Sequence, residues 1–196
     1  MAPGLDEQLR GASNVLLLGS MLDEGTKALH NQLLTQRATN GEDVLVLTFQ
    51  SPSQWLQTWT ADPDSHPGDI GIVTFSETRS RSGALPANVS SVTVNPADLT
   101  GVGITLSDYL SDWAGSDAGT IVCFESLTEL LQYTKLKSLF RFLRVITRRI
   151  EHVGGFAHFH MDPSAHDQQT VATIRSPFDA IVDPDAADGV AVSTRY

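Results

Sequence analysis

A glycine, a hydroxyl and a lysine in the stretch GSMLDEGTK, residues 19–27, are the residue types that bind nucleotide phosphates. In a phosphate-binding loop, glycines let backbone N–H groups surround the phosphates, a lysine reaches the outer phosphates and a Ser or Thr hydroxyl binds Mg²⁺. With Gly19 as the first glycine, the second glycine position falls on Glu24, the lysine position on Gly25 and the hydroxyl position on Thr26. The hydroxyl is present, whereas the second glycine and the lysine are missing.

Lys27 lies two residues beyond the expected lysine position, and on a helix this turns its side chain by about 200°. Asp23 and Glu24 would also place carboxylates beside the phosphates and repel them by roughly a few kcal/mol. One interpretation is a re-spaced loop that uses Gly25, Thr26 and Lys27. The other is a plain strand-to-helix turn in which Asp23 or Glu24 stabilises the helix N-terminus, and this turn requires no ligand.

The stretch TIVCFESLTELLQY, residues 120–133, is an apolar strand that ends in an acidic residue. Nucleoside triphosphatases hold the Mg²⁺ shell with such a carboxylate, which lies beside the phosphate loop on a neighbouring strand. Glu125 occupies this place in the pattern. Ser126 and Glu129 also have the spacing of a capping box at the start of the next helix, a structural role that needs no nucleotide.

Histidines raise a different possibility. His158 and His160 alternate along a predicted strand and share a face, with Asp162 next in phase and His166 shortly after. Two histidines and a carboxylate are a zinc ligand set, but histidines at strand ends more often hydrogen-bond within the fold. The single cysteine, Cys123, lies in an apolar strand and is expected to be a buried, inert thiol. We therefore predict no metal ligand and no catalytic residue.

Apolar runs typical of strands alternate with helical patterns along the chain. The expected strands are residues 14–18, 43–49, 69–75, 120–124 and 156–160, with shorter candidates at 91–94 and 179–182. The expected helices are residues 24–37, 51–59, 106–113, 127–151 with a break near Thr134, and 164–174. This alternation predicts an α/β fold whose mostly parallel sheet is covered by helices on both faces.

The helical stretch 135–151 combines an apolar face with a basic one. The face expected to pack on the sheet consists of Leu136, Leu139, Phe140, Leu143, Ile146 and Ile150. The adjacent basic stripe consists of Lys137, Arg141, Arg144 and Arg148, and six of the chain's 13 Lys and Arg residues lie between residues 135 and 149. The stripe is either a solvated face that pairs with surface carboxylates or a docking surface for an acidic protein partner or a second copy of the chain. Nucleic acid is the weaker candidate.

Length and charge limit the classes of protein. The 196 residues fit one domain, with a core over residues 11–190 and a short, flexible N-terminus; residues 61–68 and 77–87 are expected surface loops. The net charge of −10, with 23 acidic and 13 basic residues, disfavours non-specific nucleic-acid binding and suits the salty cytoplasm of a halophile. No apolar stretch approaches the ~20 residues of a membrane span, and the N-terminus has no signal pattern, so a cytoplasmic protein is expected.

Several stretches together resemble a known superfamily. The order NVLLLG, DVLVLTF, TIVCFESLTELLQY and GFAHFHMDPSAHDQQTVATIRSPFDAIVD resembles the core of RecA-superfamily ATPases, on the branch that includes KaiC. NPADLTGVGITLSDYL and HFHMDPSAHDQQTVATIRSPFDAIV resemble a haloarchaeal, HTR-like group of KaiC-like proteins whose phosphate loops are commonly degenerate. The resemblance covers about residues 11–190 and implies a RecA-like three-layer α/β/α sandwich.

The resemblance implies roles residue by residue. Gly19 and Thr26 match the superfamily's phosphate-loop glycine and hydroxyl, and Glu125 matches its metal-shell acid. Gly25 replaces the lysine, and no glutamate stands at residues 49–51, where the superfamily has a catalytic glutamate after the second strand.

We therefore expect a regulatory or protein-interaction module without a required cofactor. The first alternative is a residual ATP-binding switch or slow ATPase that binds ATP and Mg²⁺ with Gly25, Thr26, Lys27 and Glu125. The second is a DNA-associated accessory protein that uses the basic stripe.

Overall fold

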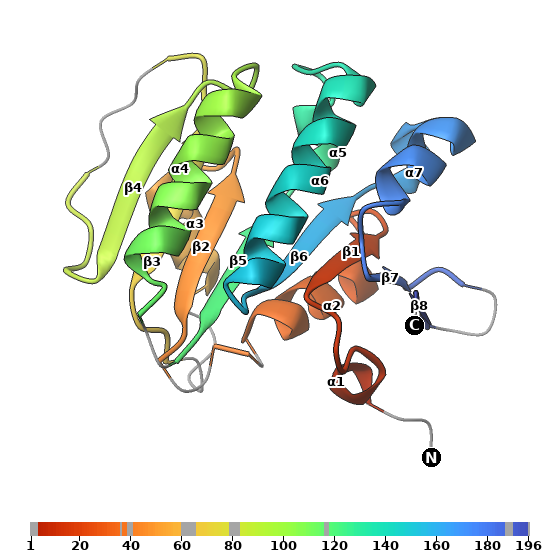
Figure 1. Ribbon diagram of the computed structural model, residues 1–196, viewed down its shortest axis with the longest axis horizontal. Coiled ribbons are helices and arrows are strands. Elements are labelled where there is room, and N and C mark those ends of the chain that lie inside the picture. Colours follow the sequence, from red (N-terminus) through yellow and green to blue (C-terminus); the bar gives the residue numbers. More distant parts are fainter. Residues whose placement is uncertain are drawn as a thin grey trace.

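A computed structural model describes residues 4–35, 37–38, 41–59, 66–78, 83–115, 118–186 and 190–195. Within these residues, eight strands form one sheet between two layers of helices (Figure 1). The predicted fold class, an α/β three-layer sandwich with a mostly parallel central sheet, is confirmed.

Most central strands are rich in Val, Leu and Ile, and all of their residues except Thr120 are buried, because helices cover both faces of the sheet. In sheet order, the strands are β4 (Val89–Val94), β3 (Ile70–Phe75), β2 (Asp43–Thr48), β5 (Thr120–Phe124), β6 (Phe156–Met161), β1 (Asn14–Leu18), β7 (Ala180–Asp183) and β8 (Ala191–Thr194). The first seven are parallel, and β8 runs antiparallel to β7. The edge strand β8 was not predicted.

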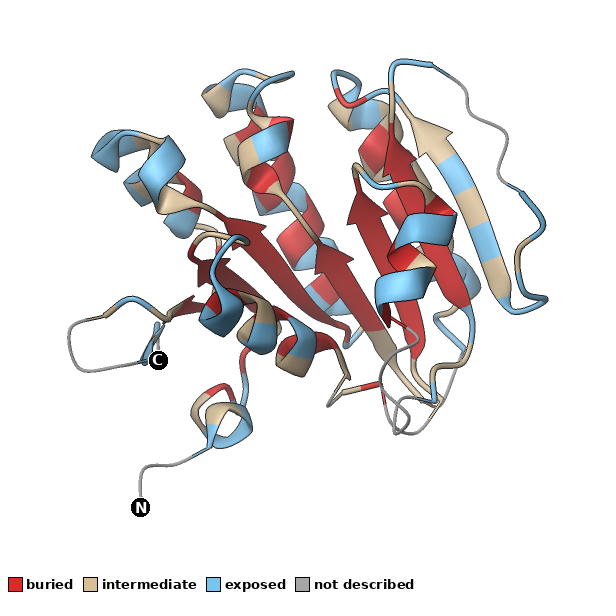
Figure 2. Cartoon of the chain, turned by 180° about the vertical axis from the view of Figure 1, so that it is seen from behind, coloured by how far each residue is buried: buried red, intermediate tan, exposed pale blue. Residues whose placement is uncertain are grey.

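The helices divide between the two faces. One face carries α2 (Glu24–Thr35) and α3 (Pro52–Trp59), and the other carries α4 (Leu99–Asp112), α5 (Leu127–Leu130), α6 (Leu136–His152) and α7 (Gln168–Arg175). A short α1 (Leu5–Gln8) precedes β1, and the 3₁₀ turn η1 (Pro163–Ala165) follows β6. Figure 2 shows the buried sheet and the exposed outer sides of the helices. No helix among the described residues is long and apolar enough to cross a membrane.

Two predicted helices differ from the observed ones because aspartate caps set their starts. α4 begins at Leu99 instead of Leu106, since the Asp98 carboxylate accepts a hydrogen bond from the Gly101 backbone N–H at 2.9 Å. Residues 164–174 divide into η1 and α7, because the Asp167 carboxylate caps α7. The predicted break near Thr134 is confirmed, since it separates α5 from α6.

The predictions for the packing of α6, for the N-terminal segment and for the loops differ from the structure in smaller ways. Phe142, which is 9% exposed, packs in the core where Phe140 was expected, and Phe140 is only half-buried. The short α1 lies in the segment expected to be flexible. The described parts of the two predicted loops, residues 66–68, 77–78 and 83–87, are neither helix nor strand, and the rest of those loops lies outside the described residues.

Candidate functional site

The loop after β1 uses its own groups as hydrogen-bond partners. The Asp23 carboxylate accepts from the backbone N–H of Thr26 at 2.9 Å and so caps α2. The N–H of Leu22 donates to the Ser20 hydroxyl at 3.3 Å, and the N–H of Asp23 donates to the Ser20 carbonyl at 2.9 Å. A phosphate bound at this loop would need the same N–H groups. The Asp23 carboxylate therefore accepts the backbone hydrogen bond at the first turn of α2 that a phosphate would need.

The predicted phosphate-site residues around this loop face in different directions. Gly19 has φ +143°, and a Cβ at this position would lie 2.5 Å from Thr26 Oγ1. The Thr26 hydroxyl is packed against Gly19, is fully buried and has no hydrogen-bond partner among the described residues. Lys27 forms an ion pair with Glu24, with 2.7 Å between Nζ and Oε1, and Gly25 is exposed.

Glu125 was expected on a strand next to the phosphate loop, and this placement is wrong because β6 lies between β5 and β1. The His160 side chain of β6 lies between the ends of β5 and β1. Its Nδ1 lies 3.1 Å from the Glu125 carbonyl oxygen, and its Nε2 lies 2.7 Å from the Gly19 carbonyl oxygen. Burial lowers the pKa of His160, and the two carbonyl contacts oppose that shift. One imidazole ring thus bridges the ends of β1 and β5.

The Glu125 side chain is held by polar neighbours. It accepts hydrogen bonds from the Thr48 hydroxyl and from Gln50 Nε2, the latter at 3.2 Å. Burial raises the pKa of Glu125, while hydrogen bonds from Thr48, Trp55 and Gln50 oppose the rise. Gln50 lies among the residues after β2 where the resemblance implies a catalytic glutamate. It is therefore a hydrogen-bond partner of Glu125.

The structure brings Lys27 and Glu125 to one pocket. This pocket, of about 530 Å³, lies between α2 and α3, and its lining includes Lys27, His30, Gln50, Trp55, Trp59 and Glu125. Trp55 and Trp59 stack with ring centroids 5.1 Å apart and give the pocket an aromatic wall. This wall was not predicted from the sequence, although the spacing of four residues between two tryptophans on one helix was a signal for it.

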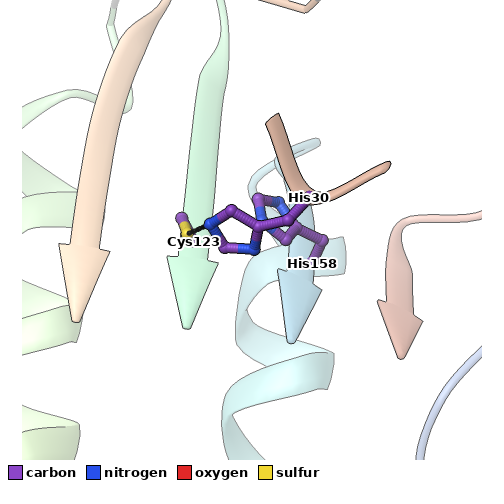
Figure 3. Close-up of side chains that lie close together, drawn as sticks. All are labelled: His30, Cys123 and His158. Carbon is purple, nitrogen blue, oxygen red and sulfur yellow. Dashed lines mark hydrogen bonds between the residues drawn. The ribbon is translucent and has the colours of Figure 1, made fainter. Parts of the chain in front are cut away.

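Three side chains from distant parts of the chain meet beneath α2 (Figure 3). His30 of α2, Cys123 of β5 and His158 of β6 are buried, and their candidate ligand atoms all lie within 4.8 Å of one another. We call them the His/Cys cluster. The shared face of His158 and His160 and the burial of Cys123 are as predicted. The sequence did not reveal that Cys123 and His30 join His158.

Burial controls the protonation of the cluster. Removal from water disfavours charged forms, so it lowers the pKa of His30 to about 4 and lowers the pKa of His158 well below its usual value. The neighbouring histidines add to both shifts. Burial also raises the pKa of the Cys123 thiol, with the Glu125 charge as a smaller cause. At neutral pH both imidazoles are therefore neutral and carry free lone pairs.

The basic stripe lies on the opposite face of the sheet. Lys137, Arg141, Arg144 and Arg148 are all exposed on α6, but they do not line one surface. Arg141 lines a groove of about 700 Å³ between α4 and α6, whereas Arg144 and Arg148 line a separate groove of about 410 Å³ on the other side of the helix. The α4–α6 groove also contains Ile104 and Val145, which are 58% and 68% exposed, and Arg149.

Comparisons with known proteins give a family and a fold. A family model described as "Family of unknown function (DUF7504)" matches residues 12–184. The curated proteins contain no match. The uncharacterized protein PH0321 from Pyrococcus horikoshii, solved in complex with an unknown peptide, has a TM-score of 0.63 and 10% identity over 97% of this chain and 89% of that one. A second Pyrococcus horikoshii OT3 structure, PH0250, has a TM-score of 0.56 and 7% identity over 96% of this chain and 91% of that one.

Proposed function

The chain belongs to the DUF7504 family of unknown function, and we propose that it is a degenerate RecA/KaiC-like protein that acts as a regulatory or protein-interaction module. The α4–α6 groove is the observation that carries this proposal. There, two exposed aliphatic side chains, Ile104 and Val145, lie beside Arg141 and Arg149 on a protein of net charge −10. Asp108 also lines the groove, and exposed aliphatic groups rimmed by charged side chains are typical of a protein-binding surface.

The loop after β1 supports the absence of ATP hydrolysis. A phosphate would have to displace the Asp23 carboxylate from the first turn of α2, and it would meet electrostatic repulsion from that carboxylate. The Lys27 ammonium group is paired with Glu24, and the Thr26 hydroxyl is buried against Gly19. The hydrogen bond to Asp23 and the ion pair with Glu24 stabilise a turn that needs no ligand.

The chemistry of the groove defines the partner as a protein segment with both apolar and acidic residues. Apolar groups of the partner would cover Ile104 and Val145, and each aliphatic side chain that leaves water contributes up to about 1.5–3 kcal/mol. Acidic groups would pair with Arg141 and Arg149. At high salt the ionic part is screened and the apolar part persists, so binding of this kind suits a halophile's cytoplasm. The peptide bound to PH0321 supports a protein partner for this fold.

A matched pair of double variants tests the groove. A photo-crosslinking amino acid at position 145 first captures the partner in cells, and mass spectrometry identifies it. The purified partner is then titrated against two variants with the same change in composition. Arg141→Glu with Arg149→Glu should weaken binding at least tenfold, or about 1.4 kcal/mol. Arg144→Glu with Arg148→Glu, which alters the other groove, should leave the affinity within about threefold.

Comparison of the two double variants distinguishes binding in the α4–α6 groove from binding along the whole basic stripe. Equal losses in both double variants would assign binding to the whole basic stripe, including nucleic acid if the captured partner is DNA or RNA. Unchanged affinity in both would refute the docking surface. Val145→Ala removes apolar surface without adding a charge, so it tests the apolar part alone, and its effect should persist in multimolar KCl.

A residual nucleotide site is the second candidate, because Lys27 and Glu125 share a pocket with an aromatic wall. Calorimetric titration of ATP and Mg²⁺ in multimolar KCl, at concentrations that detect a dissociation constant of about 100 μM, distinguishes the two. A module without a nucleotide site gives no saturable heat. Saturable binding that is lost in Lys27→Ala and in Glu125→Ala would instead establish an ATP-binding switch.

A further inference from the structure

We propose that His30, Cys123 and His158 bind one zinc-like divalent cation, with the fourth coordination position directed to the pocket between α2 and α3. The site is independent of the α4–α6 groove, since it lies on the other face of the sheet. It also differs from a nucleotide site, because its ligands are imidazole nitrogens and a thiolate.

The ligand types and their spacing suit zinc. Zn²⁺ takes Cys sulfur at about 2.3 Å and His nitrogen at about 2.0–2.1 Å in tetrahedral geometry, which separates neighbouring ligand atoms by about 3.3–3.6 Å. His30 Nε2 already lies 3.8 Å from Cys123 Sγ, and all the candidate ligand atoms lie within 4.8 Å of one another. Tetrahedral coordination would require the longest of these separations to shorten by up to about 1.5 Å.

Three of the four ring nitrogens of His30 and His158 have no hydrogen-bond partner among the described residues. Neither ring nitrogen of His158 has a partner among the described residues, although the residue is 0% exposed, and the same holds for Nδ1 of His30. Buried polar atoms are nearly always satisfied, because an unsatisfied one costs about 1–3 kcal/mol. A cation bound between the rings would take one nitrogen from each imidazole, and one of the unpartnered His158 nitrogens would then have a partner.

His160 acts as a nearby contrast within the same strand. Its ring centroid lies 6.5 Å from that of His30, yet both of its nitrogens contact backbone carbonyl oxygens. His160 is thus committed to bridging Gly19 and Glu125, whereas His158, two residues earlier on the same face, is not. The unsatisfied nitrogens belong to the residues that surround Cys123.

The charge of the bound cation and its access from the pocket between α2 and α3 also have to be accounted for. A cation would replace the thiol proton of Cys123, and the proton would leave to solvent; the cation and thiolate together then carry one net positive charge. Glu125 lies on the same face of β5, two residues beyond Cys123, and supplies a nearby carboxylate. His30 and Glu125 both line the pocket between α2 and α3, so a water molecule or ligand in that pocket can occupy the fourth position.

Cobalt(II) is the probe that reports the ligands directly. Protein produced without a polyhistidine tag is refolded with and without Co²⁺, so that burial of the cluster does not prevent loading. Bound Co²⁺ should reach one equivalent, with thiolate-to-cobalt charge-transfer absorption and the intense visible bands of tetrahedral geometry. Zn²⁺ should displace it and raise the melting temperature.

The variants distinguish this cluster from metal bound elsewhere. Cys123→Ala removes one sulfur atom and should abolish the charge-transfer band, and His158→Gln should lower metal affinity at least tenfold. His152→Ala removes an exposed histidine on α6 and should leave both measurements unchanged. Circular dichroism checks each fold; if His158→Gln does not fold, Cys123→Ala alone decides the test. No stoichiometric metal, or a cobalt spectrum unchanged in Cys123→Ala, would overturn the proposal.

Discussion

The carboxylate of Asp23 caps the first turn of α2, where the resemblance to ATPases implies a phosphate. The pattern GSMLDEGTK left two interpretations open: a re-spaced phosphate loop or a plain capped turn. The bond from the Thr26 N–H to Asp23 and the pair between Lys27 and Glu24 are the contacts of a capped turn. The two acidic residues therefore have different roles, one as the cap and the other in an exposed ion pair.

Substitution of these two residues should separate their contributions to stability. Asp23→Ala should lower the free energy of unfolding by about 1 kcal/mol, because the Thr26 N–H loses its acceptor. Asp23→Asn, which keeps an acceptor oxygen, should restore most of that loss. Glu24→Gln should change stability by less than about 0.5 kcal/mol, since exposed ion pairs contribute little. Urea denaturation measures all three, and equal losses for Asp23→Ala and Glu24→Gln would contradict the capping role.

Two glycines lie near the start of α4, and one of them, Gly103, lines the α4–α6 groove. Gly103 faces Phe142 of α6, and a Cβ at position 103 would lie 3.6 Å from the Phe142 ring, in ordinary van der Waals contact. Gly101 lies against the cap, where a Cβ would come within 2.5 Å of the Asp98 carboxylate. Two glycines in one helix thus meet different surroundings.

Substitution of each glycine by alanine should affect the free energy of unfolding differently. Gly103→Ala should raise the free energy of unfolding by about 0.5–1 kcal/mol, because alanine favours the helix and restricts the unfolded chain. Gly101→Ala should not raise it, because the added methyl group displaces the Asp98 cap, which is worth about 1 kcal/mol. Urea denaturation of the two variants provides the comparison. The same gain in both would show that the cap adjusts without cost.

The sheet separates the molecule into two functional faces. One face carries the pocket between α2 and α3 and the His/Cys cluster, and the other carries the α4–α6 groove and the divided basic stripe. No substitution proposed for one face touches a side chain of the other, so the proposed metal site and the proposed docking surface can be tested separately. Because β6 lies between β5 and β1, His160 of β6 also links the carbonyl oxygens of Gly19 and Glu125.

Local patterns were sufficient to predict the layered fold. Apolar strands alternating with amphipathic helices specify which faces are buried, and burial on both sides of a strand requires helices on both faces of a parallel sheet. The errors arose where a capping side chain outweighed helix propensity, as at Asp98 and Asp167. The edge strand β8 is short and mostly exposed, so its apolar pattern is weak.

The meeting of side chains from different strands was decided only by tertiary structure. Periodicity indicates that His158 and His160 share a face, but it does not indicate which strand pairs with β6 or which helix covers it. Cys123 and His30 are 93 residues apart and meet because β5 pairs with β6 beneath α2. Strand order, helix placement and the partners of each buried polar atom depend on contacts across the whole chain, and these contacts leave no repeating pattern in the sequence.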